Sequence, residues 1–433
     1  SIFERYLAWV VRMKRRSVLL GAVGGIAAVG TGALLWRPTD TGAPHDAYFS
    51  ALNDLLKREG SGIPVMMLDL DRISTNIDLI TESVGADKTY RVVVKSLPSV
   101  PLLRHVMSRA KTKSLMVFHQ PFLNEIAKEF PDADSLLGKP MPVNAASTFY
   151  KKVDETRYDT ASKVQWLIDS PERLNQYYSL ARELGVKMRV NLEIDVGLHR
   201  GGIPNSEVMA SMLNIIKGAP DHLELSGLMG YEPHLTGLEA SLSHPAVKNV
   251  LATYSGFLTT VRQAGYDAEK LTLNGAGSHT LGIYRKDRTM NDLSAGSGVV
   301  KPTDFDTYHL AGNSPALFIA TPILKRYDEL KIAGDHWAQG PLQAWNPNMR
   351  RLYYIYGGFW KAKMVSPEGV ADPLYESTNQ SPIATSTSVD LQVDDYMFMR
   401  PTQSEFVMLQ FGDLLAVSGN QIVDKWPVFH QTE

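Results

Sequence analysis

The feature that most constrains the fold is a regular alternation of short apolar runs with longer amphipathic stretches across the middle of the chain. Such runs are typical of buried strands, and the stretches between them, such as 170–184, 205–217 and 238–264, have the spacing of helices. The eight predicted strands are 91–94, 114–118, 135–137, 164–169, 187–194, 223–229, 271–274 and 293–299. Strands that alternate with helices pair in parallel, so we predict an α/β fold with a closed (β/α)8 barrel.

The composition changes after about Asn313, where aromatic residues, valine, proline and glycine become frequent. Three segments there have the composition of short strands, namely 351–358, 405–410 and 412–417. We therefore predict a barrel domain over 45–312, followed by an all-β C-terminal domain over 313–433. The apolar run 64–70 precedes the barrel and is a candidate additional strand of the second domain.

The N-terminus has the pattern of a membrane anchor. Basic residues within 12–16 precede an uncharged run over 17–36, which as a helix with ~1.5 Å rise per residue would span a ~30 Å hydrocarbon layer. Cations before the run favour an orientation with the N-terminus inside. Arg15 and Arg16 also resemble a twin-arginine export signal, and the two interpretations stay open. We expect residues 1–40 to place the protein at a bacterial inner membrane, with its catalytic domain on the periplasmic side.

Composition narrows the chemistry. The chain has 44% apolar residues, which excludes a largely disordered protein, and its net charge of -2 gives no reason to expect a nucleic-acid partner. Cysteine is absent, so the chain has no cysteine nucleophile and no thiolate-ligated zinc or iron–sulfur site.

Lys95 directly follows the predicted strand 91–94. The C-terminal ends of barrel strands form the active-site face, and partial desolvation there favours the neutral amine that a Schiff base needs. The alternative is an ordinary strand-end lysine that extends into water.

A glycine-rich loop follows the seventh predicted strand. Gly275, Gly277 and Ser278 could bring backbone N–H groups and a hydroxyl close to an anion, at the position where such barrels hold phosphate. A plain turn is the alternative interpretation.

Two further strand ends carry polar residues. Arg200, in the glycine-flanked segment 195–202, is a candidate fixed cation, and the adjacent His199 is a candidate acid or base. The next strand end adds Tyr231 and His234. A loop histidine exposed to solvent without a catalytic role is the alternative for both histidines.

Together these features resemble the fold type III pyridoxal-phosphate enzymes. The nearest branch is that of D-threonine aldolase and D-serine dehydratase, which has a barrel domain of the alanine racemase type. The resemblance extends over roughly residues 63–429. It rests on the order and spacing of 64–71 with Asn76, Arg91-x-x-x-Lys95, 195–202, 227–231, 275–278, 292–297 and 423–428.

The resemblance implies pyridoxal 5′-phosphate as cofactor. Lys95 would carry the internal aldimine, Arg200 would contact the ring oxygen, and Tyr231 would line the pyridine side. The phosphate would be held by Gly275, Gly277 and Ser278. Relatives usually form dimers, so the resemblance also implies a homodimer, with a partner in a membrane complex as the other possibility.

The chain departs from this family pattern at three places. Val93 stands where the aldolase and dehydratase have a histidine two residues before the lysine. Their metal motif, Pro-x-His-x-Cys or Pro-x-His-x-Asp, is matched by a segment that carries Gln403 and Glu405. Gly298 replaces the tyrosine of a Gly-Ser-Tyr sequence. We therefore predict that the cofactor core is kept and assign no metal ligand.

The predicted function is a lyase for D- or β-hydroxy amino acids, with Lys95, His199 and His234 as catalytic residues. One alternative is an amino-acid racemase, in which a tyrosine from 353–356 would be the second base. The other is a membrane-anchored binding or accessory subunit without turnover.

Overall fold

The computed structural model describes residues 37–432 apart from 238–240, 332–333, 335–336 and 338. The chain forms two compact units, each made of several segments. A β-rich unit contains the described residues up to Met67, and the described residues of Phe318–Thr402 and Gly419–Ile422. A barrel unit contains Leu68–Leu317, Gln403–Ser418 and the residues from Val423 onward.

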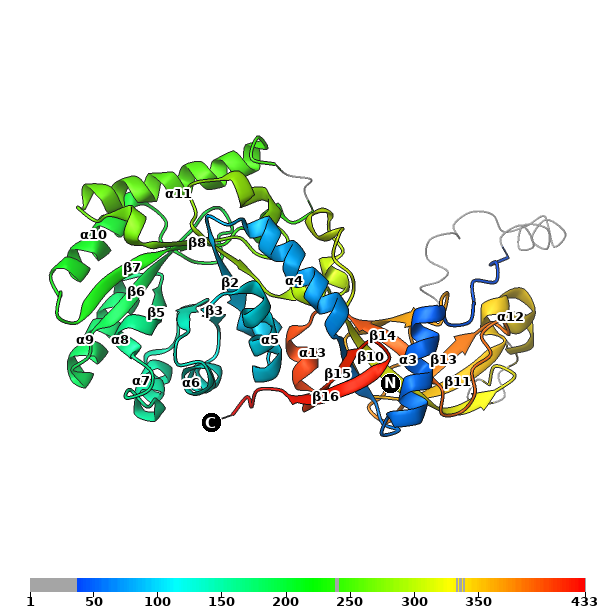
Figure 1. The fold of residues 1–433 in the computed structure, drawn as a ribbon. Helices are drawn as coiled ribbons and strands as arrows, with labels where there is room; N and C mark the ends of the chain where they lie inside the picture. Colours follow the sequence, from blue (N-terminus) through cyan, green and yellow to red (C-terminus); the bar gives the residue numbers. More distant parts are fainter. Residues whose placement is uncertain (1–36, 238–240, 332–333, 335–336, 338, 433) are drawn as a thin grey trace. The chain divides into compact units, whose positions relative to one another are not determined.

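The barrel unit contains a closed barrel of eight parallel strands, which confirms the predicted barrel (Figure 1). Each strand pairs with the next in chain order, and β9 closes the barrel on β2. The strands are β2 (Thr89–Val93), β3 (Ser114–Val117), β4 (Asp134–Leu137), β5 (Val164–Ile168), β6 (Met188–Ile194), β7 (Leu223–Gly230), β8 (Thr272–Gly275) and β9 (Asp292–Ala295).

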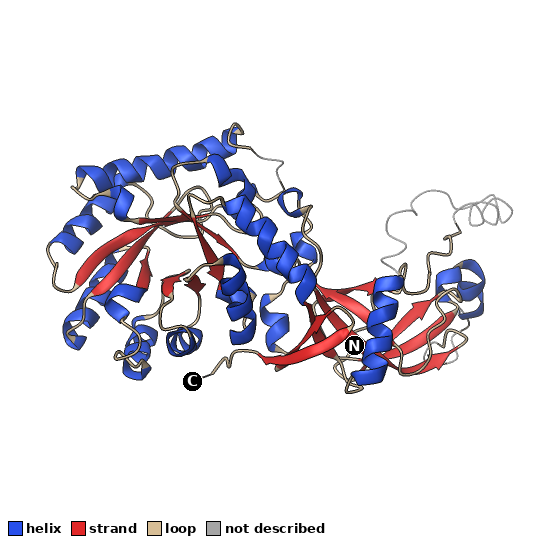
Figure 2. Cartoon of the chain, in the orientation of Figure 1, coloured by secondary structure: helices blue, strands red, loops and turns tan. Residues whose placement is uncertain are grey.

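Helices connect most of these strands and cover the outside of the barrel (Figure 2). They are α4 (Leu70–Val84), α5 (Val100–Ala110), α6 (Gln120–Glu129), α7 (Val143–Lys152), α8 (Thr160–Lys163), α9 (Pro171–Leu184), α10 (Ser206–Lys217) and α11 (Pro245–Gln263). After β8 the connection is the 3-10 helix η4 (Leu281–Lys286) instead of an α-helix.

Helix α9 shows how local sequence sets these elements. The side chain of Ser170 accepts a hydrogen bond from the N–H of Arg173, and Pro171 occupies the first helical turn, where it loses no helical hydrogen bond. Gly185 ends the helix with a left-handed φ of 66°. The face that includes Leu174 and Tyr177 is buried, so apolar burial holds the helix in place.

Two predicted strands differ in the structure. The predicted strand 293–299 ends at Ala295, because Gly296 leaves the extended conformation (φ -144°, ψ -69°) and a 3-10 turn, η5 (Ser297–Val299), follows. The predicted strand 405–410 is wrong, since α13 (Glu405–Leu409) is a short helix. Its adjacent residues Val407 and Met408 are both buried, a pattern that a strand with alternating faces does not produce.

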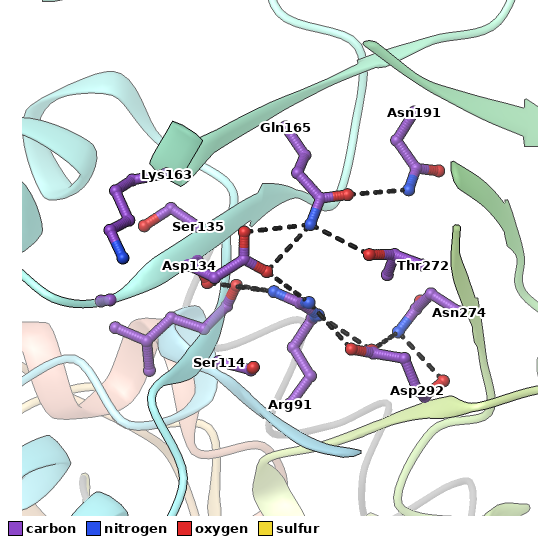
Figure 3. A network of polar contacts seen from close by, with 12 residues as sticks. Arg91, Ser114, Asp134, Ser135, Lys163, Gln165, Asn191, Thr272, Asn274 and Asp292 are labelled. Atoms are coloured by element: carbon purple, nitrogen blue, oxygen red, sulfur yellow. Dashed lines mark hydrogen bonds and ion pairs between the residues drawn. The ribbon is translucent and has the colours of Figure 1, made fainter. Parts of the chain in front are cut away.

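The barrel interior holds a buried ion network, drawn in Figure 3. Arg91 of β2 is 1% exposed, and its guanidinium bonds both carboxylate oxygens of Asp292 at 2.8 Å and one of Asp134 at 2.7 Å. Burial alone would raise the pKa of Asp134, but the charge of Arg91 holds it below its usual value. The amides of Gln165 and Asn274 donate further hydrogen bonds to the two carboxylates, so every charge in the network is paired.

The β-rich unit has antiparallel strand pairs. Its elements are α3 (Ala47–Glu59), β1 (Val65–Asp69), β10 (Leu317–Tyr327), α12 (Gln339–Trp345), β11 (Arg351–Tyr356), β12 (Ala362–Ser366), β13 (Gln380–Thr385) and β14 (Tyr396–Pro401). The strand order is β12-β14-β10-β1, and β11 pairs with β10 and β13. The apolar run that precedes the barrel therefore forms a strand beside β10. Two neighbouring strands near the C-terminus are β15 (Asp413–Ser418) and β16 (Gln421–Pro427).

The predicted membrane segment, 17–36, lies outside the described residues. None of the helices among the described residues combines the length and apolar composition that a membrane span needs.

Candidate active site

A cavity of about 320 Å³ lies at the C-terminal ends of barrel strands, including β2, β7, β8 and β9. Its volume lies at the lower end of the ~300–1,000 Å³ typical of small-molecule sites, and this end of a barrel is where active sites form. Five residues singled out in the sequence line it: Lys95, Arg200, Tyr231, Gly277 and Ser278. A larger hollow of about 640 Å³ lies beside α6 and the C-terminal residues, but none of these five residues reaches it.

Lys95 lies in the 3-10 turn η1 (Val94–Ser96), directly after β2. Its Nζ is 2.8 Å from Oε1 of Glu405 and 4.8 Å from the centre of the Phe118 ring. The side chain is 39% exposed. The amine therefore faces the cavity with an anionic partner on one side and an aromatic face on another.

Glu405 is the first residue of α13, so the segment that sequence analysis matched to a metal motif does reach this cavity. Gln403 instead donates a hydrogen bond from its amide to Asp304 at 2.7 Å. Among the described residues, no group of three or more His, Cys, Asp or Glu side chains could hold a metal ion.

The glycine loop after β8 meets a second glycine loop after β9. The hydroxyl oxygen of Ser278 accepts hydrogen bonds from the N–H groups of Gly296 (3.2 Å) and Gly298 (3.0 Å). A Cβ added at Gly296 would lie 2.8 Å from side-chain carbons of Val93 and Ser96, so only glycine fits there. With its oxygen held by the two backbone N–H groups, the Ser278 hydroxyl keeps its own proton to donate to an anion such as phosphate.

Gly275 does not line the cavity, because it is the last residue of β8 and a Cβ there would lie 2.3 Å from the sulfur of Met290. A Cβ at Gly277 would be 3.0 Å from the Tyr231 ring. Gly275 thus allows Met290 to pack closely behind the loop, and Gly277 allows the Tyr231 ring to approach the loop.

A buried carboxyl group that sequence reasoning missed supports the same loop. Glu232 has no exposed surface and accepts hydrogen bonds from Thr280 Oγ1 (2.7 Å) and from the N–H of Ala276 (3.3 Å). Burial raises the pKa of Glu232 to about 7. The only available signal was a charged residue immediately after the apolar β7, next to the recognised Tyr231.

The loop after β6 places Arg200. Asp195 accepts hydrogen bonds from the N–H groups of Gly197 (2.9 Å) and His199 (3.0 Å), which closes a tight turn. Gly202 has φ 98°, and a Cβ there would lie 2.8 Å from the backbone of Ile194. The guanidinium carbon of Arg200 consequently lies 5.2 Å from the centre of the Tyr231 ring. Burial raises the pKa of Tyr231, which keeps its hydroxyl protonated.

The predicted acid–base histidines do not line the cavity. His199 is 81% exposed and its Nδ1 bonds Asp195 at 2.7 Å, while His234 is exposed in the 3-10 turn η2 (Pro233–Leu235). Among the described residues, His279 is the histidine that does line it. Its ring stacks on Phe305 at 4.2 Å, and burial lowers its pKa. Catalytic roles for His199 and His234 stay predictions.

A sequence model described as "Alanine racemase, N-terminal domain" matches residues 68–300, more than half of the chain. No curated protein sequence matches.

Solved structures share the fold across most of the chain. D-threonine aldolase from Filomicrobium marinum superposes with a TM-score of 0.69 at 14% identity, covering 86% of this chain and 98% of that one. For D-threo-3-hydroxyaspartate dehydratase from Delftia sp. HT23 the TM-score is 0.66 at 15% identity, with 85% and 97% covered. For alanine racemase from Bacillus anthracis with bound L-Ala-P it is 0.64 at 15% identity, with 84% and 97% covered.

Proposed function

The chain belongs to the family of the alanine racemase N-terminal domain, a fold type III pyridoxal-phosphate family, and we propose that it is a pyridoxal-phosphate-dependent lyase of D- or β-hydroxy amino acids. One observation carries the proposal. The amine of Lys95 and the hydroxyl of Ser278 line a single cavity at the active-site end of the barrel.

The residues present fit this cofactor. Lys95 offers an amine for the cofactor's aldehyde, and Ser278, whose oxygen is held by the N–H groups of Gly296 and Gly298, offers a hydroxyl donor for its phosphate. Arg200 and Tyr231 are the residues that would hold the ring. When bound, pyridoxal phosphate supplies a sink for the electron pair released at the substrate Cα.

A lyase also needs a group that removes or delivers a proton at the β-hydroxyl. Besides the predicted His199 and His234, we include His279, because its ring lines the cavity and burial keeps it in the neutral form. A neutral imidazole can accept a proton at physiological pH.

The test is to reconstitute the purified protein with pyridoxal phosphate and incubate it with a panel of D-amino acids. An aldehyde plus glycine identifies an aldolase, and a keto acid plus ammonia identifies a dehydratase. Formation of the L-enantiomer would identify the alternative racemase.

Borohydride trapping adds a structural readout. We expect an adduct that mass spectrometry maps to Lys95 and that Lys95→Ala abolishes. Lys113→Ala is the matched control, since Lys113 precedes β3 at the opposite end of the barrel and is 70% exposed. A protein that stays colourless with excess cofactor, or an adduct on another lysine, would overturn the proposal and favour a binding subunit.

A further inference from the structure

Glu405 is the anionic group in direct contact with the proposed cofactor lysine. Its Oε1 lies 2.8 Å from Lys95 Nζ, and both side chains line the cavity. The two residues lie in segments of the barrel unit that are far apart in the chain. The pair is only partly shielded from water, with the side chains 39% and 34% exposed.

A chain of buried hydroxyl groups ends on the same oxygen of Glu405. The hydroxyl of Ser404 donates to Ser297 (3.2 Å), Ser297 donates to Ser96 (3.0 Å), and Ser96 donates to Glu405 Oε1 (3.4 Å). These three serines are at most 3% exposed. Because each hydroxyl points its proton towards the carboxylate, the chain orients the Glu405 side chain beside Lys95.

The chemistry proposed for the cavity requires proton removal from amines. Primary amines are ordinarily ammonium ions near neutral pH, and an ammonium nitrogen has no lone pair with which to attack a carbonyl carbon. A carboxylate that contacts the amine can accept the proton and return it later.

We propose that Glu405 is the proton acceptor for amines in this cavity, for Lys95 and then for the substrate amino group; this deepens the proposed function and rests on it. The proton that Glu405 takes from the Lys95 ammonium passes on to water, which restores the carboxylate. One proton then passes from the substrate ammonium to the Glu405 carboxylate, which leaves a neutral substrate amine and a carboxylic acid. When Lys95 is displaced as a neutral amine, it takes that proton from Glu405. The products of this exchange are the ammonium and carboxylate that form the observed ion pair.

The other titratable groups that line the cavity are Arg200, Tyr231 and His279, and Asp304 is hydrogen-bonded to Gln403 beside it. Burial lowers the pKa of His279 and raises that of Tyr231, and arginine stays charged throughout. These three groups therefore keep one charge state between about pH 7 and pH 10. If the rate of amine exchange depends on pH in that range, and the dependence is lost when Glu405 is replaced, we assign it to the amines and to Glu405.

The first experiment uses the cofactor-free protein and a probe of free amines, trinitrobenzenesulfonate, with labelling of Lys95 quantified by mass spectrometry at pH 7.5. Without the carboxylate the amine loses its ion-pair partner, so Lys95 in Glu405→Gln should label about 2–5 times faster, the size of a solvent-screened ion pair. Asp304→Asn is the matched control, because it removes a different negative charge beside the cavity, on the side chain that accepts the Gln403 hydrogen bond, but leaves Glu405 in place. Equal labelling of Lys95 in all three proteins would overturn the proposal.

The second experiment follows amine exchange in the cofactor-loaded protein. Methylamine is mixed with the protein, and the absorbance change reports how fast it displaces Lys95. At pH 7.5 we expect Glu405→Gln to be slower by on the order of 100-fold, the lower end of general-base contributions. At pH 9.5, where more methylamine is already neutral, the difference should shrink, and Glu405→Asp should restore part of the rate. A purely structural ion pair would slow the exchange equally at both pH values, which would contradict the inference.

The two proposals fail in different ways. If no cofactor binds but Lys95 still labels faster in Glu405→Gln, the proposed function fails, and the proton exchange between Lys95 and Glu405 remains supported. If cofactor is trapped on Lys95 in both proteins and methylamine exchanges at the same rate at pH 7.5, the function stands and the role of Glu405 fails.

Discussion

Strand β2 and the turn after it contribute one cation to each end of the barrel interior, and the two cations have opposite surroundings. Arg91 is 1% exposed, and both carboxylates beside it accept further hydrogen bonds from neighbouring amides. Lys95, four residues later, is 39% exposed with a carboxylate that is itself 34% exposed. The first network is closed and fully paired, whereas the second faces a cavity.

This difference separates stability from chemistry. A buried guanidinium with paired carboxylates has no vacant position for a ligand, and removing it would leave charges buried without a partner. A partly exposed amine with one carboxylate can change partners, since water compensates for the loss. The end of the barrel that holds Arg91 therefore supports the fold. The end that holds Lys95 and the cavity is available for reaction, as in other (β/α)8 barrels.

The largest expected effect comes from Lys95→Arg, which keeps the positive charge but removes the primary amine. We expect complete loss of the borohydride-trapped adduct, because a guanidinium stays protonated and cannot attack an aldehyde. The free energy of unfolding, measured in urea, should change by less than about 1 kcal/mol. Substantial destabilisation would mean that the open pair also supports the fold.

Arg91→Met should have the opposite consequence. Removing the guanidinium leaves the buried Asp292 without a cation, while Asp134 keeps only Arg189 at 3.3 Å, and we expect a loss of about 3–5 kcal/mol in the free energy of unfolding. Arg109→Met is the matched control, because the Arg109–Asp78 pair is exposed and its loss should change the free energy of unfolding far less. If both variants lose the same amount of unfolding free energy, buried and exposed ion pairs contribute equally to stability and the comparison fails.

The strands and helices of the barrel could be predicted because hydrophobic periodicity is a local signal. Placing Lys95 and Ser278 at strand ends followed from the barrel, since all parallel strands point the same way. The segment 405–410 was assigned incorrectly because six residues are too few to distinguish a strand from a short helix.

Long-range contacts could not be predicted in this way. The pair of Lys95 with Glu405 joins residues that only the completed fold brings together. The burial of Glu232 likewise depends on the loop that closes over it. Sequence reasoning selected His199 and His234 by proximity to strand ends, but whether a loop side chain turns into the cavity, as His279 does, depends on packing against residues such as Phe305.

Glu232 extends the comparison, because it is fully buried like Arg91 but its hydrogen-bond donors are neutral. Its pKa of about 7 in the folded protein is above the ordinary value of 4.5. The folded state therefore holds more protons than the unfolded state between these values, and stability falls as pH rises from about 4.5 to 7. Glu232→Gln should remove a decrease of the order of 3 kcal/mol between pH 5 and pH 8, measured by urea unfolding.

Burial also raises the pKa of Glu193 to about 7. Glu193 contributes equally to the pH dependence of stability in the wild-type protein and in Glu232→Gln, so the difference between the two stability curves is due to Glu232. Parallel stability curves for the two proteins would show that the Glu232 carboxyl is ionised in the folded state.

Ser278→Ala tests whether the donors around that hydroxyl bind phosphate. The variant keeps the N–H groups of Gly296 and Gly298 but loses the Ser278 hydroxyl. Affinity for pyridoxal phosphate, measured by equilibrium dialysis, should fall by roughly 1 kcal/mol, or more if the bond is to a charged oxygen. Affinity for pyridoxal, which has no phosphate, should stay the same, and an equal loss for both compounds would place the phosphate elsewhere.

The smallest expected effect is that of removing divalent metals. Gln403 offers a neutral amide that is already bonded to Asp304, and Glu405 is paired with Lys95. A site that held zinc or manganese here would have to break both contacts, and a single carboxylate binds such ions weakly. Dialysis against EDTA should therefore leave both the trapped adduct and the rate of product formation unchanged. Stoichiometric metal that survives dialysis and is lost in Glu405→Ala would show that the open end binds a cation in addition to Lys95.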